Sequence, residues 1–82
     1  MATKTQDVKF EIINNIGVVS ALSGGWNLEL NRVSWNGNEP KYDIRTWSPD
    51  HTKMGKGITL SEKELISLFE VLDKEVAFLK QD

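Results

Sequence analysis

The chain has 82 residues, no cysteine and a formal net charge of −2, which is enough for one domain and too little for two. The lack of cysteine excludes disulfides, thiol catalysis and cysteine-ligated zinc, and no apolar run approaches the ~20 residues that a membrane span needs. Hydrophobic residues (39%) and charged residues (27%) are typical of a soluble globular domain, which we expect in the cytoplasm because no signal peptide is recognisable.

The N-terminal part of the sequence predicts a tail and one long β-strand. Met1–Asp7 is polar and has no periodicity, so we expect a disordered tail, with the domain proper at residues 8–82. Val8–Leu22 is rich in β-branched residues but is interrupted by asparagines and a glycine. This pattern predicts one bent strand, or two short strands with a turn or bulge near Asn15. A turn at Ser23-Gly24-Gly25 follows.

The next segment, Trp26–Trp35, predicts a second strand that ends in a hairpin turn. Its apolar side chains switch parity between residues 30 and 33, so we expect a bulge near Asn31–Arg32. The turn is predicted at residues 36–40, where an Asn-Gly pair tolerates the positive φ that tight hairpins require.

Lys41–Trp47 is the clearest strand, because two kinds of side chain alternate along it. Tyr42, Ile44 and Thr46 occupy one face, and Lys41, Asp43, Arg45 and Trp47 occupy the other. Such alternation is typical of a strand with one buried and one wet face. Since lysine and arginine rarely face a dry core, we expect the second face, and Trp47 with it, to meet solvent.

The C-terminal part of the sequence predicts a loop, a fourth strand and one helix. The loop spans His51–Gly55 and the strand Lys56–Leu60. A helix begins at Ser61, and Glu64 three residues later completes a capping-box pattern. Along the helix, apolar residues recur at steps of four and three and form a seam able to face another helix. The seam consists of Leu65, Phe69, Leu72, Val76 and Leu79.

Three tryptophans in so short a chain need an explanation, and core filling is the simplest one for any of them. Trp47, however, shares its strand face with two cations, and Trp35 precedes the hairpin that leads into that strand. Aromatic rings exposed among cations form a platform on which bases of any kind can stack. Residues 32–57 carry five bases and three acids, a net of +2, whereas residues 58–82 carry three bases and six acids, a net of −3. This basic middle favours nucleic-acid binding, although protein binding stays open.

No residue pattern indicates a catalytic centre, a cofactor or a metal site. Met54–Thr59 lacks the spacing of a phosphate loop, and the glycines beside Lys56 either let the backbone approach a phosphate or form a tight turn. Ser48, Asp50 and His51 lie too close together in the chain to make a hydrolase triad. His51 is the only histidine, and no cysteine or carboxylate cluster accompanies it at ligand spacing.

Two runs resemble the single-stranded-DNA-binding domain of the transcriptional coactivator known as positive cofactor four. They are Lys41-Tyr42-Asp43-Ile44-Arg45-Thr46-Trp47 and Lys56-Gly57-Ile58-Thr59-Leu60-Ser61. The resemblance spans residues 8–80 and is strongest to the short bacterial branch of that family. It implies an α+β fold, in which a curved four-stranded antiparallel sheet is followed by one helix (ββββα) and the helices of two copies pair into a homodimer.

The resemblance also implies which residues bind nucleic acid. Arg45 matches the family's strand arginine, Trp47 its following aromatic residue, and Trp35 an aromatic residue before the hairpin turn. Lys56 matches the basic residue before Gly-Ile, and the further lining residues are Lys41, Arg32, Lys53 and Tyr42. The dimer interface would be the helix seam, Leu65, Phe69, Leu72, Val76 and Leu79. One departure from the family is a turn at residues 36–38 without a lysine, which removes an expected phosphate contact.

These patterns together predict a homodimer that binds single-stranded DNA with little sequence preference, in transcription regulation, replication or repair. We expect no enzyme activity, no cofactor, no metal and no membrane contact. One alternative is single-stranded RNA, because nothing in the sequence is suited to sense a 2′-hydroxyl. The other alternative is a protein-interaction module that uses the C-terminal helix.

Overall fold

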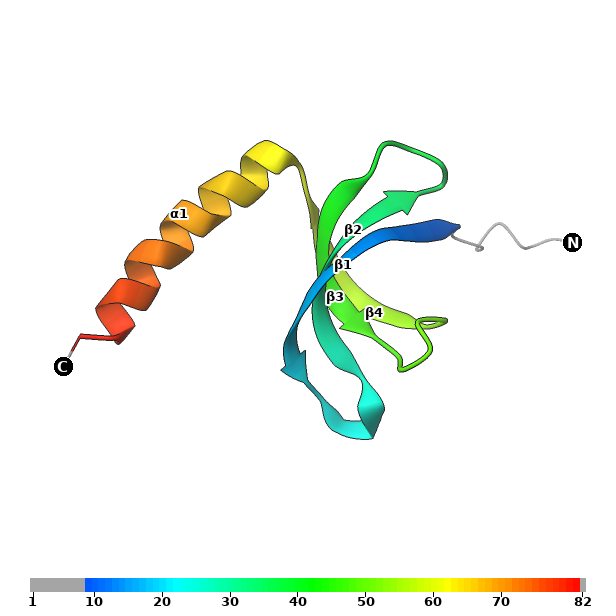
Figure 1. Ribbon diagram of the computed structural model, residues 1–82, viewed down its shortest axis with the longest axis horizontal. Helices are drawn as coiled ribbons and strands as arrows, with labels where there is room; N and C mark the ends of the chain where they lie inside the picture. The colour runs from blue at the N-terminus through cyan, green and yellow to red at the C-terminus, as the bar shows by residue number, and fades with distance from the viewer. Residues whose placement is uncertain (1–8, 82) are drawn as a thin grey trace, which may run out of the picture.

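The computed structural model describes residues 9–81, which form one antiparallel sheet followed by a helix (Figure 1). The elements are β1 (Phe10–Ala21), a short 3-10 turn η2 (Ser23–Gly25), β2 (Asn27–Trp35), β3 (Lys41–Trp47), β4 (Met54–Leu60) and α1 (Glu62–Leu79). The strands lie in the order β1-β2-β3-β4, each beside its neighbour in the chain. The predicted ββββα order is confirmed, whereas the predicted tail at residues 1–7 lies outside the described residues.

Strand β1 is bent by bulges, as its sequence predicts. Its pairing with β2 shifts register three times, and one of these shifts lies between Asn15 and Gly17. The bulge predicted near Asn31–Arg32 of β2 is wrong, because β2 pairs with β3 without a shift from Asn27 to Val33. The apolar residues of β2 change parity for another reason: both faces of this central strand are partly covered.

The core of the sheet lies on the face turned away from α1. Val33 and Trp47 are fully buried there, and the Phe10 ring packs with its centroid 5.1 Å from that of Trp47. The buried polar residues on this face are Glu29, Asn31 and Asp43. The expectation that Trp47 meets solvent is therefore wrong: the sheet curls, and the face that carries the charges becomes enclosed.

Two local features shape the strand ends. Asn36 and Gly37 both have positive φ, 53° and 77°, as a two-residue hairpin turn requires. The Asn36 side chain also accepts a hydrogen bond of 3.1 Å from the Lys9 amide, which ties the start of β1 to this turn. In β4, a Cβ on Gly57 would overlap with Arg45 and with the Ile44 carbonyl. Glycine is needed there for close strand pairing, which favours a structural reading of the glycine beside Lys56.

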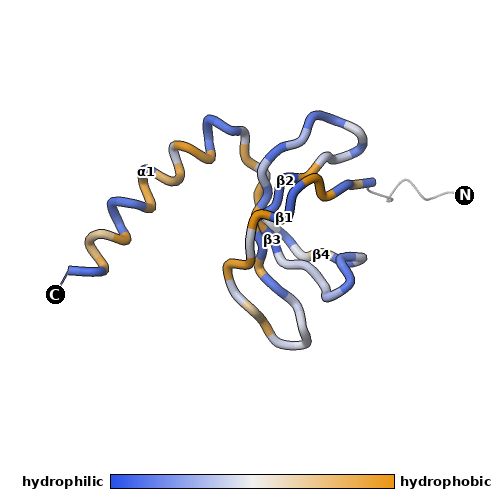
Figure 2. Tube along the Cα trace, viewed as in Figure 1, coloured by the Kyte–Doolittle hydropathy of each residue, from blue (hydrophilic) through white to orange (hydrophobic). Residues whose placement is uncertain are grey.

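Helix α1 begins with the predicted capping box and then leaves the sheet. The Ser61 amide donates to the Glu64 carboxylate at 2.8 Å, and the Glu64 amide donates to the Ser61 hydroxyl at 3.1 Å. Apolar residues recur along the helix (Figure 2), yet no residue of α1 is buried. Phe69 and Leu79 of the seam are 65% and 69% exposed. The seam thus stays open in the single chain, and the homodimer stays a prediction.

Candidate functional site

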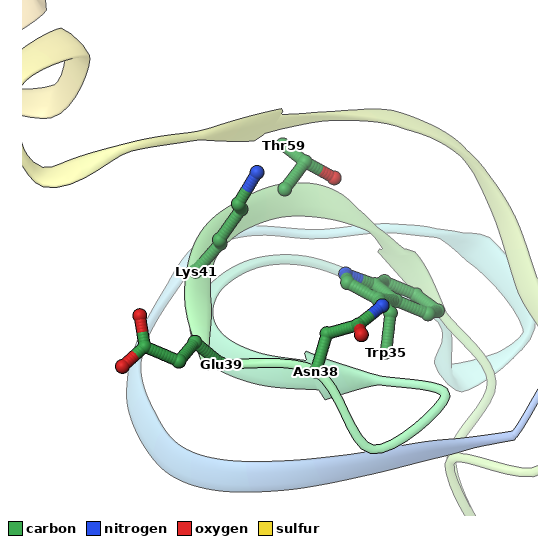
Figure 3. Close-up of a pocket in the computed structure, with 5 residues that line it drawn as sticks. All are labelled: Trp35, Asn38, Glu39, Lys41 and Thr59. Atoms are coloured by element: carbon green, nitrogen blue, oxygen red, sulfur yellow. The ribbon is translucent and has the colours of Figure 1, made fainter.

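An open pocket of about 330 Å³ lies where the β2–β3 hairpin brings Trp35 and Lys41 together. Trp35 is the last residue of β2 and Lys41 the first of β3. Figure 3 shows the indole ring beside the Asn38 side chain, with Lys41 and Thr59 across the pocket. Glu39 contributes the one acidic side chain of the lining. This site, called the Trp35 pocket below, offers a flat aromatic surface next to an exposed ammonium group.

Arg45 holds the indole ring of Trp35 in place. Its guanidinium carbon lies 4.7 Å from the ring centroid, within the range of a cation–π contact. The same guanidinium donates two hydrogen bonds to the fully buried Asp43 carboxylate, at 2.6 and 2.8 Å. The Thr59 hydroxyl donates a third to that carboxylate at 3.0 Å. Asp43 therefore neutralises the Arg45 charge, and Arg45 is suited to position Trp35 more than to meet a phosphate.

A second polar cluster closes the other end of the enclosed face. The Nε2 atom of His51 lies 3.0 Å from both carboxylate oxygens of Glu29, and the Asn31 amide donates to Glu29 at 3.0 Å. Burial by itself would raise the pKa of the Glu29 carboxyl, but hydrogen bonds from Asn31 and His51 and the His51 charge hold it below its ordinary value. The His51 ring also packs on Trp47, with centroids 5.6 Å apart. His51 thereby covers the core.

The loop between β3 and β4 is held by Asp50. One oxygen of its carboxylate accepts hydrogen bonds from the Thr52 hydroxyl at 2.7 Å, the Thr52 amide at 3.1 Å and the Ser48 hydroxyl at 2.9 Å. These bonds, those from Thr52 first, lower the pKa of Asp50 to about 2. Because Asp50 serves the loop and His51 faces Glu29, no relay links Ser48, Asp50 and His51.

The predicted binding residues divide into four pairs in the structure. Trp35 and Lys41 share the Trp35 pocket, and Lys53 and Lys56 are exposed on the β3–β4 loop and on β4. Arg45 and Trp47 lie within the enclosed face, where Arg45 keeps 15% of its side chain exposed and Trp47 none.

The fourth pair is Arg32 and Tyr42, which are cross-strand partners. Because neighbouring residues of a strand point to opposite faces, they lie on the face opposite Val33 and Asp43. Tyr42 thus lies on the face opposite Arg45, as the alternation along β3 predicts, and its part in ligand binding stays a prediction. Arg32 instead borders a neighbouring recess of about 350 Å³ that also includes Lys41 and Glu62.

Sequence reasoning overlooked the acids that hold the site together. Asp43 and Arg45 are two residues apart on one strand, so their side chains share a face, and this spacing could have predicted their ion pair. The contact of His51 with Glu29 joins residues that are 22 positions apart, and no local sequence pattern predicts it. The ring centroids of Phe10 and Trp35 are 6.0 Å apart. The sequence pattern predicts only a strand at Phe10 and not this contact.

Within residues 9–81, no group of three acidic, histidine or cysteine side chains is placed to hold a metal ion. Over the same described residues, no helix has both the length and the apolar character to cross a membrane.

Comparison with known proteins gives one family and one relative. The family model described as Transcriptional Coactivator p15 (PC4) matches residues 22–71, which run from the turn before β2 into α1 and include the whole Trp35 pocket. An uncharacterized protein of Treponema pallidum (strain Nichols) is 49% identical over 67 residues, which cover 82% of this chain and 79% of that protein. The family match confirms the resemblance that the two sequence motifs predicted.

Proposed function

Because this chain belongs to the Transcriptional Coactivator p15 (PC4) family, we propose that it binds single-stranded DNA with little sequence preference and catalyses no reaction. The observation that carries the proposal is the Trp35 pocket, where an aromatic ring and the free ammonium of Lys41 meet in an open cavity. A base stacks on the ring while its phosphate meets the ammonium. Such stacking contributes about 1–3 kcal/mol per base and tolerates any sequence. We assign this binding to transcription regulation, replication or repair.

The arrangement of charges supports the same proposal. Within residues 9–81, no lysine lies within ion-pair distance of a carboxylate, because Asp43 pairs with Arg45 and Glu29 contacts His51. The three lysines that flank the sheet, Lys41, Lys53 and Lys56, therefore keep their charges for a ligand. Arg45 contributes indirectly, because it fixes the indole ring before the base arrives and so reduces the entropy lost on binding. The buried Trp47 packs on Phe10 within the enclosed face and so supports the sheet beside Trp35.

We further propose that the protein acts as a homodimer paired through α1. A recess of about 320 Å³ between the helix and the sheet is lined by apolar side chains, among them Leu30, Ile44, Leu65 and Phe69. It continues into the exposed helix seam, and exposed apolar patches of this kind mark association surfaces. Since the recess lies on the α1 side of the sheet and the enclosed face lies on the other, pairing through α1 leaves both Trp35 pockets open.

The test is quenching of tryptophan fluorescence by an oligo-dT of about 20 nucleotides at two salt concentrations, with duplex of equal length as the control. We expect salt-dependent quenching by oligo-dT and little by duplex. If a dimer neutralises about 3–6 phosphates, log K falls against log salt with a slope of about −2 to −4. Lys41→Ala should reduce this slope, whereas Lys74→Ala, an exposed lysine of α1 far from the pocket, should not.

Two outcomes would redirect the proposal. A folded protein whose fluorescence changes with neither oligo-dT nor oligo-U would contradict nucleic-acid binding and leave the helix seam as the candidate docking surface for a protein. Tighter binding of oligo-U than of oligo-dT in direct competition would identify single-stranded RNA as the ligand. The Trp35 pocket could accommodate either ligand, because base stacking requires no contact with the sugar.

A further inference from the structure

Trp26 is the third tryptophan, and it lines neither the Trp35 pocket nor the core around Trp47. It directly follows η2 and precedes β2, and it is half-buried at the surface and absent from the core around Val33 and Trp47. Its side chain borders a recess of about 310 Å³ whose other lining residues are Ser48, Pro49, Asp50, Thr52 and Lys53. The recess therefore combines an aromatic ring with a lysine, as the Trp35 pocket does.

The recess is built by two segments that brace each other. A Cβ placed on Gly25 would lie 2.9 Å from the Pro49 ring, so η2 and the β3–β4 loop are in close contact. The loop itself is closed by hydrogen bonds of 3.0 Å from the Ser48 amide to the Lys53 carbonyl and from the Lys53 amide to the Ser48 hydroxyl. These bonds fix the backbone of Lys53, which lines the same recess as Trp26, so the position from which Lys53 extends is preorganised.

From this geometry we propose that the recess of Trp26 and Lys53 is a second nucleotide subsite, which binds a base and a phosphate of the same single strand that occupies the Trp35 pocket. The inference rests on the proposed function and extends it to the path of the ligand. The two sites sit at opposite ends of β2, nine residues apart in the chain, a contour of about 30 Å along the strand. The β2–β3 hairpin and the β3–β4 loop both project from the sheet on the side away from α1 (Figure 1).

Asp50 is the one acid in this recess, and its charge is already engaged. Its carboxylate accepts three hydrogen bonds from its own loop and keeps a pKa of about 2. The carboxylate thus stabilises the loop that presents Lys53. A single strand that leaves the Trp35 pocket can reach the second subsite only if it is long enough, so the inference predicts a dependence on ligand length.

The experiment compares oligo-dT of about four and about twelve nucleotides on the full chain, with Trp26→Ala, Trp35→Ala and the conservative control Trp26→Phe. Trp35→Ala should weaken both lengths. Trp26→Ala should weaken the longer ligand about 5- to 150-fold and change the shorter one less than about 2-fold, while Trp26→Phe keeps most of the affinity. Lys53→Glu, at an exposed position, should lower affinity for the longer ligand alone and is informative even if Trp26→Ala does not fold.

The results separate this inference from the proposed function. If Trp35→Ala weakens binding but Trp26→Ala and Lys53→Glu bind the longer ligand as the parent does, the second subsite is refuted and the Trp35 pocket stands. If Trp26→Ala weakens both lengths equally, the effect does not come from a distant subsite and the inference is again refuted. If the parent binds neither ligand, the proposed function fails and the inference fails with it.

Discussion

The replacement Asp43→Asn tests whether the buried ion pair beneath Trp35 stabilises the fold. Removal of one partner of a buried pair costs about 3–5 kcal/mol. Here the Arg45 side chain is 15% exposed and asparagine still accepts a hydrogen bond, so we expect a smaller loss, about 2–3 kcal/mol. In a domain of this size each kcal/mol lowers Tm by about 4–8 °C. The predicted decrease in Tm is therefore about 10–20 °C.

Urea unfolding followed by circular dichroism measures this effect, at one fixed protomer concentration because a dimer would make stability depend on concentration. Glu70→Gln removes an exposed acid from α1 and serves as the control, with an expected change within about 0.5 kcal/mol. A double-mutant cycle with Arg45→Leu should give a coupling energy of at least about 1 kcal/mol. An Asp43→Asn variant as stable as the Glu70→Gln control would refute the role given to this pair.

Three further predictions concern the core, the acid response and the helix. Trp47→Phe should lower the free energy of unfolding by about 1–3 kcal/mol and leave oligo-dT affinity within about 2-fold once the protein is folded; a large loss of affinity without a loss of stability would show that Trp47 contacts the ligand. A group whose pKa is lower in the folded state stabilises the fold above its unfolded pKa and loses this effect as the pH falls. Asp50 therefore stabilises the fold at pH 5 and loses its contribution between pH 3.8 and about 2. The Tm of Asp50→Asn should change less than that of the parent over this range, and parallel profiles of Tm against pH would contradict the reasoning. Leu72→Asp should yield monomers in analytical ultracentrifugation, whereas Ser67→Asp, on the other side of α1, should leave the assembly intact; equal behaviour of the two variants would argue against pairing through the seam.

Features that depend on neighbouring residues could be predicted from the sequence. The bounds of β3 follow from strict alternation, the hairpin from Asn36-Gly37, and the helix start from Ser61 and Glu64, all of which the structure confirms. Each of these signals acts within a few residues, so tertiary packing has little chance to override it. The bulge near Asn15 belongs to the same class, because an asparagine and a glycine interrupt a β-branched run.

Features that depend on contacts between distant segments could not be predicted. The assignment of Trp47 to solvent rested on the rule that charged residues avoid a dry core. That rule fails here because Asp43 and Arg45 satisfy each other and His51 reaches Glu29 from a loop. The recess of Trp26 and Lys53 depends on contact between η2 and the β3–β4 loop, which no periodicity encodes.

The two faces of the sheet invert the usual relation between polarity and burial, because the polar face is enclosed and the apolar face is open. The enclosed face holds Glu29, Asn31 and Asp43, whereas apolar residues such as Ile58 and Phe69 stay exposed on the other face and on α1. A polar interior is tolerated when each charge has a partner, and it supplies rigid support for an aromatic ring. An apolar exterior is tolerated when another surface covers it. The alternation along β3 therefore separates a polar face from an apolar face, and polarity by itself does not tell which of the two is enclosed within one chain.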